Sequence, residues 1–109
     1  MAEENKEDVK ELKIEQHKEG YTLTCKLTGW LDPNTSPDLI TKIDLKGVTL
    51  LTFDMEKVEY VFSSGLRAFL MLQKMLEPQG GTIKLINVSD ELRNIFEYTG
   101  FESMLEPKA

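Results

Sequence analysis

The sequence has few of the side chains that catalysis and metal binding require. It contains one cysteine, Cys25, and one histidine, His17. A single cysteine excludes an internal disulfide, and one cysteine with one histidine leaves no ligand cluster of the kind that holds zinc. A serine nucleophile would need a histidine base with a carboxylate behind it, but His17 falls in an expected hairpin turn. We therefore expect a protein that is not an enzyme and that binds no metal or cofactor.

Long apolar runs and basic segments are also missing. No stretch approaches the roughly 20 apolar residues of a membrane-spanning helix, and the first residues, MAEENKEDVKE, carry charge throughout. The net charge is −6 at pH 7, with 19 acidic against 13 basic side chains, so the protein repels nucleic acid and acidic membrane surfaces. These absences predict a cytoplasmic protein with neither a nucleic acid nor a membrane as its partner.

The 109 residues are enough for one domain with its own hydrophobic core. Residues 1–10 lack hydrophobic periodicity, and we expect them to form a flexible acidic segment before a domain at 11–109. Apolar and polar residues alternate at Leu12 and Ile14 and again from Tyr21 to Leu27, and the polar HKEG between them predicts a hairpin. Two further strands are predicted at Val48–Met55 and Thr82–Val88.

Three helices are predicted between and after these strands. A short one follows the turn Asp32-Pro33-Asn34, with Thr35 or Ser36 as its N-cap, and ends before Gly47. The last helix is capped by Ser89 and ends at Gly100. The longest covers Ser64–Glu77, with Ser63 as its N-cap and an apolar face made of Leu66, Phe69, Leu70, Leu72, Met75 and Leu76.

This order of elements predicts an α/β domain. We expect a mixed four- to five-stranded sheet in which the N-terminal hairpin is antiparallel and the later strands are parallel, joined by right-handed crossovers. Strands covered on both faces read as continuous apolar runs, whereas these alternate, so the helices should lie mainly on one face. The hairpin leaves an exposed edge that could pair with another copy, and we expect a monomer or a weak homodimer.

The stretch VEYVFSSGLRAFL, residues 58–70, joins the third strand to the longest helix. Helix capping is a sufficient structural reason for Ser63. Gly65, however, costs helix stability by roughly 0.5–1 kcal/mol relative to alanine, which suits a place where something approaches the backbone closely. The joint also follows the carboxyl end of a strand, where αβ sheets place their sites, and a phosphate on Ser63 would lie at a positive helix end. Trp30, at the end of the second strand, is either a partner contact or a side chain partly buried under a loop.

Four segments together resemble the STAS domain, in particular the bacterial anti-sigma factor antagonists. Val58–Leu66 is similar to the signature that normally reads Asp-Ser-Ser-Gly or Asp-Ser-Thr-Gly and then Leu. Leu27–Asp32, with Thr35 behind it, is similar to the family's Leu-x-Gly-x-Leu-Asp…Thr. Thr52–Met55 matches the strand before the serine motif. Gly80–Val88, followed by Phe96 and Thr99–Phe101, resembles the closing strand and helix, so that the resemblance covers about Leu12–Leu105.

The resemblance implies a regulator that works by partner switching. In the family, the unphosphorylated antagonist binds an anti-sigma factor that is also a serine kinase, and so frees a sigma factor for transcription. The kinase phosphorylates the first serine of the motif, which ends binding, and a phosphatase of the PP2C type restores it. Carried over by position, the phosphoacceptor is Ser63, with Ser64 as the alternative. The implied partner-binding residues are Asp32, Thr35, Phe62, Ser63, Ser64, Gly65 and Arg67.

Two residues depart from the family pattern. Phe62 occupies the position of the family's aspartate, so the acidic neighbour that would repel a phosphate is missing. Arg67 replaces a residue that is commonly small, and four residues past Ser63 on a helix its side chain leans back far enough to reach a phosphate there. Phe62 also favours a second hypothesis, a STAS module that does not switch by phosphate and serves as a constitutive interaction component or a ligand sensor.

Overall fold

Four strands form one mixed sheet in a computed structural model of the chain, which describes residues 11–105. The strands are β1 (Leu12–Glu19), β2 (Thr22–Leu31), β3 (Leu50–Val61) and β4 (Thr82–Ile86), and they lie in the order β1-β2-β3-β4. β1 pairs with β2 antiparallel, whereas β2 with β3 and β3 with β4 are parallel. The predicted mixed sheet with an antiparallel N-terminal hairpin is confirmed. The segment 1–10, expected to be flexible, lies outside the described residues.

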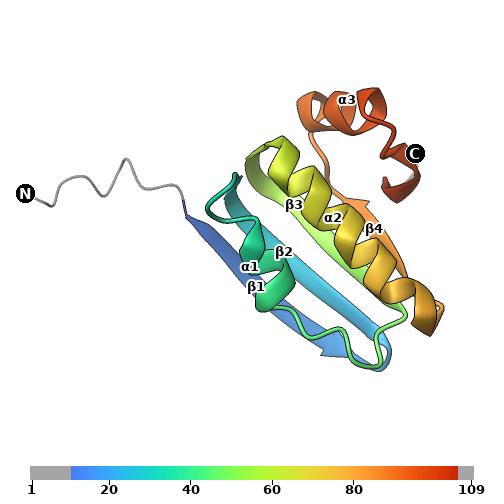
Figure 1. Cartoon of the computed structure of the whole chain (residues 1–109). Helices are drawn as coiled ribbons and strands as arrows, with labels where there is room; N and C mark the ends of the chain where they lie inside the picture. Colours follow the sequence, from blue (N-terminus) through green and yellow to red (C-terminus); the bar gives the residue numbers. More distant parts are fainter. Residues whose placement is uncertain (1–10, 106–109) are drawn as a thin grey trace, which may run out of the picture.

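The helices cover one face of this sheet, as expected (Figure 1). α1 (Pro37–Thr41) and α2 (Ser63–Leu76) contact each other over that face. α3 (Asp90–Tyr98) packs against α2 through the rings of Phe96 and Phe69, whose centroids are 5.9 Å apart. Two 3-10 helices, η2 (Glu77–Gln79) and η3 (Glu102–Met104), follow α2 and α3. Within residues 11–105, no helix is both long and apolar enough to cross a bilayer.

The core lies between the sheet and the helices, and the period-2 pattern of the strands explains it. Phe53 of β3 packs edge-on against Phe69 of α2 at 5.1 Å, so the residues in phase with Phe53 face the helices. Burying each such side chain contributes about 1.5–3 kcal/mol. The buried residues in phase are Leu23, Cys25 and Leu27 of β2 and Leu51, Phe53 and Met55 of β3. On the other face, Thr22, Thr24 and Lys26 are half-buried.

Three local predictions about the strands and the buried face of α2 are wrong. His17 lies within β1 opposite Thr24, and not in a turn, because only Gly20 and Tyr21 connect β1 to β2. Gly20 has φ +63°, which lets the connection be that short. β3 continues to Val61 instead of ending at Met55. The register between β2 and β3 shifts twice, and the two strands remain paired as far as Leu31 and Val61.

The third error concerns α2. Leu70 and Met75 were predicted on its apolar face, but they are 40% and 46% exposed. The buried face of the helix is narrower than the number of apolar residues in it suggests. The buried members of that stripe are Leu66, Phe69, Leu72 and Leu76. By contrast, the predicted cap of the last helix is confirmed, since the Ser89 hydroxyl accepts a hydrogen bond from the Leu92 amide at 3.2 Å.

Candidate functional site

Ser63 is the first residue of α2 and does not cap it. The residue in the cap position is Phe62, whose backbone is extended at φ −86° and ψ 173°. The carbonyl of Phe62 accepts from the amides of Gly65 and Leu66 at 2.9 and 3.1 Å. The prediction of Ser63 as the N-cap is therefore wrong by one residue. Freed from that role, the Ser63 side chain is exposed, and its hydroxyl has no hydrogen-bond partner within residues 11–105.

Ser64 has a different environment from Ser63. Its side chain is half-buried, and its Oγ lies 3.3 Å from the Oγ of Ser36, which is only 3% exposed. This contact joins the start of α2 to the loop that leads into α1. Of the two adjacent serines, only Ser63 presents a free hydroxyl to solvent.

The loop beside α2 is held together by Asp32 and Thr35, which are 8% and 6% exposed. One carboxylate oxygen of Asp32 accepts from the amides of Asn34 and Thr35 at 2.8 and 3.0 Å. The Thr35 hydroxyl donates to the Trp30 carbonyl at 2.6 Å and accepts from the Asp32 amide at 3.0 Å. These two buried side chains fix the conformation of the loop through internal hydrogen bonds. A partner would therefore contact mainly the backbone of the loop and not the two side chains themselves.

Gly65 is buried where α2 starts against the ends of β2 and β3. A Cβ on Gly65 would lie 2.9 Å from the Cβ of Leu31 and 3.0 Å from a methyl group of Val61. The close approach that the sequence suggested is therefore made by the chain's own strands. The amide of Phe62 donates to the Leu31 carbonyl at 2.8 Å, which holds the joint against β2.

Three aromatic side chains, Trp30, Tyr60 and Phe62, form an aromatic cluster beside Ser63. Phe62 is 39% exposed and stacks on Trp30, with ring centroids 5.9 Å apart and an interplanar angle of 28°. Tyr60 meets Phe62 edge-on at 4.9 Å and lies opposite Trp30 in the pairing of β2 with β3. The Trp30 indole donates to a carboxylate oxygen of Glu59 at 3.1 Å. Trp30 is half-buried, and its contacts include Tyr60 of β3 and Phe62 of the joint between β3 and α2.

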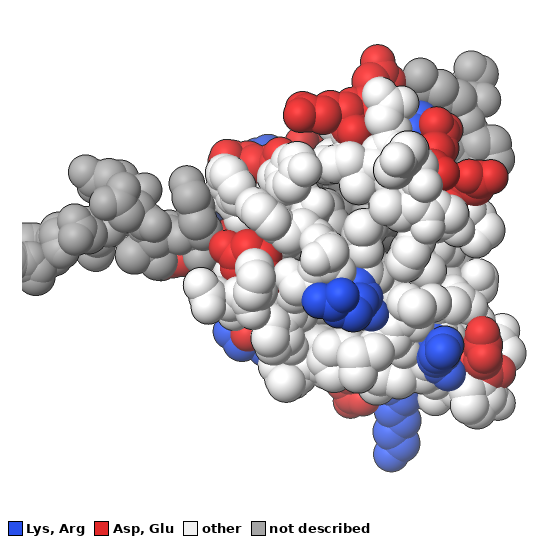
Figure 2. All heavy atoms as spheres, turned by 45° about the horizontal axis from the view of Figure 1, so that its top comes forward, with Lys and Arg blue, Asp and Glu red and all other residues white. Residues whose placement is uncertain are grey.

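α2 carries positive charge in an acidic protein. Its fourteen residues include Arg67 and Lys74 and no Asp or Glu, and its N-terminus is the positive end of the helix dipole. In Figure 2, Asp and Glu gather mainly around the rim of the visible face, whereas its middle is uncharged apart from Lys and Arg. The start of α2 is therefore favourable for an anion.

The structure also bears on thiol chemistry and on metal binding. Burial raises the pKa of the Cys25 thiol to about 12, which keeps it a protonated core side chain at neutral pH. Within residues 11–105, no three or more His, Cys, Asp or Glu side chains are grouped so that they could hold a metal ion.

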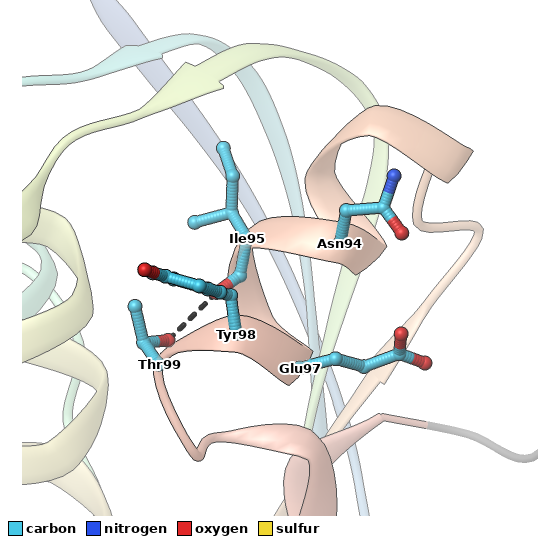
Figure 3. A pocket seen from close by; sticks show the side chains of 5 residues that line it. All are labelled: Asn94, Ile95, Glu97, Tyr98 and Thr99. Carbon is cyan, nitrogen blue, oxygen red and sulfur yellow. Dashed lines mark hydrogen bonds between the residues drawn. The ribbon is translucent and has the colours of Figure 1, made fainter.

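Several hollows lie on the surface of residues 11–105, and one of about 360 Å³ has Thr35 in its lining. Two others involve the helices. The first, of about 460 Å³, is a groove between α1 and α2 that includes Ser64 and Arg67. The second, of about 630 Å³, is lined by Asn94, Ile95, Glu97, Tyr98 and Thr99 (Figure 3). There the Thr99 hydroxyl donates to the Ile95 carbonyl at 2.7 Å, and Tyr98 and Glu97 point in opposite directions. The second hollow contains none of the predicted site residues, whereas the groove includes two of them, Ser64 and Arg67.

Several known proteins are similar to this chain. The anti-sigma-B factor antagonist of Bacillus subtilis is 36% identical over 55 residues, which are 50% of this chain and 50% of that protein. The anti-sigma-B factor antagonist of Staphylococcus aureus strain NCTC 8325 is 29% identical over 97 residues, covering 86% of this chain and 90% of that protein. The match therefore spans half the length of the first relative and most of the second.

Solved structures share the fold. The anti-sigma factor antagonist SpoIIAA in its unphosphorylated form superimposes with a TM-score of 0.78 and 22% identity over 89% of each chain. Its phosphorylated form gives a TM-score of 0.66 at 22% identity, over 89% of this chain and 92% of that one. The model of the STAS domain family matches residues 6–108. This chain belongs to the STAS domain family.

Proposed function

We propose that this protein is an anti-sigma factor antagonist that binds an anti-sigma factor serine kinase, releases a sigma factor, and is switched off by phosphorylation of Ser63. The observation that carries the proposal is the difference between the two serines of the motif. Ser63 is exposed with a free hydroxyl, whereas Ser64 is half-buried against Ser36. The curated relatives named as antagonists support the same role. The protein would act in the cytoplasm as a regulator and not as an enzyme, with a PP2C-type phosphatase restoring the active form.

A phosphate on Ser63 would change the surface in a way that opposes partner binding. The unmodified serine is a small neutral group beside the half-exposed ring of Phe62. Phosphorylation adds about −1.5 to −2 charges, and burying such a hydrated anion in an interface carries a large desolvation cost. The phosphate itself would be stabilised in the free protein, because it would lie at the positive end of the α2 dipole, next to the Ser63 and Ser64 amides that have no acceptor within the helix.

Arg67 would add to that local stabilisation. It lies one turn after Ser63 on the exposed side of α2, and no acidic residue of α2 competes for it. In the phosphorylated protein its guanidinium would pair with the phosphate, and in the unmodified protein it would remain available to the partner.

The runner-up is a STAS module that does not switch by phosphate and acts as an interaction or ligand-sensing component. Phe62 favours it, since its ring stacks on Trp30 in the place where the family has an aspartate. A constitutive aromatic contact would use this cluster whether or not Ser63 is modified.

The two functions are separated by incubating the protein with the serine kinase encoded in its own genome and ATP, and mapping phosphate by mass spectrometry. We expect one phosphate, on Ser63, which is lost in Ser63→Ala and retained in the matched control Ser64→Ala. A Ser63→Asp variant should bind the kinase at least about tenfold more weakly than the wild type, because it introduces a charge at the centre of the contact. No phosphate on either serine, together with wild-type kinase affinity of Ser63→Asp, would refute the switch and favour the runner-up.

A further inference from the structure

We propose that the solvent-facing side of α2, together with the groove beside it, docks an amphipathic helix of the kinase whose apolar residues are flanked by carboxylates. The inference rests on the proposed function, because it extends the surface that the same partner would use. It concerns residues beyond the serine motif: Ile40 of α1 and Leu70, Met71, Lys74 and Met75 of α2.

The first observation is where the exposed apolar side chains lie. Six large ones are exposed in residues 11–105, and four of them belong to α2 or immediately precede it: Phe62, Leu70, Met71 and Met75. Leu70, Met71 and Met75 are 40%, 53% and 46% exposed, although Phe69 and Leu72 of the same helix are fully buried. Core packing therefore explains the apolar residues on the buried side of α2, but it does not explain Leu70, Met71 and Met75 on the exposed side. Apolar patches on a small monomer commonly mark interaction sites, and methionine adapts to varied partners.

The second observation is that the apolar stripe borders a groove of suitable shape. The groove of about 460 Å³ has Pro37 and Ile40 on its α1 side and Ala68 and Met71 on its α2 side. At one end it includes Ser64 and Arg67, so it starts next to the predicted phosphoacceptor. It is therefore continuous with the proposed contact around Ser63. A helix that lays apolar anchors into such a groove is a common mode of recognition.

The third observation is charge, which decides the kind of partner. The chain has a net charge of −6, whereas α2 has Arg67 and Lys74 without any carboxylate. An acidic partner meets favourable charges on this face, and a basic one would be drawn to other parts of the molecule. An anionic membrane fits less well, because two cations attract it weakly while the remaining negative charge repels it.

The test measures the affinity of the full-length kinase for charge-changing variants and matched controls. Met71→Glu places a carboxylate in the groove and Lys74→Glu reverses a cation on the stripe. Tyr98→Glu and Lys84→Glu make comparable changes at exposed positions on α3 and β4. We expect Met71→Glu to weaken binding at least about tenfold and Lys74→Glu about three- to tenfold, with a shallower salt dependence, while both controls stay within about twofold. Circular dichroism and thermal unfolding verify that each variant is folded.

The outcomes separate this inference from the proposed function. Wild-type protein that neither binds the kinase nor is phosphorylated on Ser63 refutes the proposed function and this surface with it. If the wild type binds the kinase and the affinities of Met71→Glu and Lys74→Glu both stay within about twofold of the wild-type value, the docking surface alone is refuted. The docking surface is likewise refuted if the variants change only self-association, seen by sedimentation, or only binding to anionic lipid vesicles.

Discussion

The Thr35 hydroxyl ties the end of β2 to the start of α1, and its removal tests whether the loop beside the serine motif depends on it. In the variant Thr35→Val the shape is kept, but the Trp30 carbonyl at 2.6 Å and the Asp32 amide at 3.0 Å both lose their hydrogen bond to the Thr35 hydroxyl. A buried polar group left without a partner costs about 1–3 kcal/mol. Thr35 is 6% exposed, so water compensates only in part. We expect the free energy of unfolding to fall by about 2–3 kcal/mol.

For a domain of this size, each kcal/mol shifts the melting temperature by roughly 4–8 °C, so the expected decrease is roughly 10–20 °C. Thermal and urea unfolding followed by circular dichroism measure it. Two controls accompany the variant: Thr35→Ser keeps both hydrogen bonds, and Thr49→Val makes the same change at an exposed position. If Thr35→Val loses no more stability than Thr49→Val, the hydroxyl does not hold the loop and the reasoning is refuted.

Two further predictions concern α2 itself. Gly65→Ala should lower the free energy of unfolding, measured by urea titration, by about 1–2 kcal/mol. The added Cβ would lie 2.9 Å from the Cβ of Leu31, and the cost of this overpacking exceeds the gain in helix propensity. An unchanged or raised free energy of unfolding would show that the joint can accommodate a methyl group. Arg67→Ala should raise the pKa of the Ser63 phosphate by a few tenths and speed its removal by phosphatase, measured by ³¹P NMR titration and a dephosphorylation time course. Lys74→Ala, about 16 Å of helix rise from Ser63, is the matched control, and equal behaviour of the two variants would exclude an Arg67–phosphate pair.

The aromatic cluster explains why a phenylalanine, and not the family's aspartate, suits position 62 of this chain. An aspartate in this position would stand next to two aromatic rings, whereas the phenylalanine stacks on Trp30 and contacts Tyr60. Such pairs contribute about 0.5–1.5 kcal/mol beyond the area they bury. The departure from the family pattern thus comes with neighbours that suit it, and it leaves an apolar ring half-exposed beside the proposed phosphoacceptor.

The amino-acid sequence by itself determined the order of elements, the one-sided sheet and the family. Each of these depends on information carried by neighbouring residues. The alternation around Cys25 and Phe53 selects the buried face of a strand. Ser89 with an acidic first turn starts α3. The motif around Ser63 is a contiguous stretch, so its resemblance to the STAS domain could be seen without a structure.

Only the tertiary structure decided which groups of the site face solvent. Tyr60 joins the aromatic cluster because two register shifts in β2 place it opposite Trp30. The close packing of α2 against Leu31 and Val61 leaves little room for a side chain at Gly65, while Met71 of the same helix remains exposed. Ser64 turns toward Ser36 and leaves Ser63 free, which no local pattern distinguishes in two identical adjacent residues. Strand register and packing depth depend on residues far apart in the chain, so local periodicity cannot specify them.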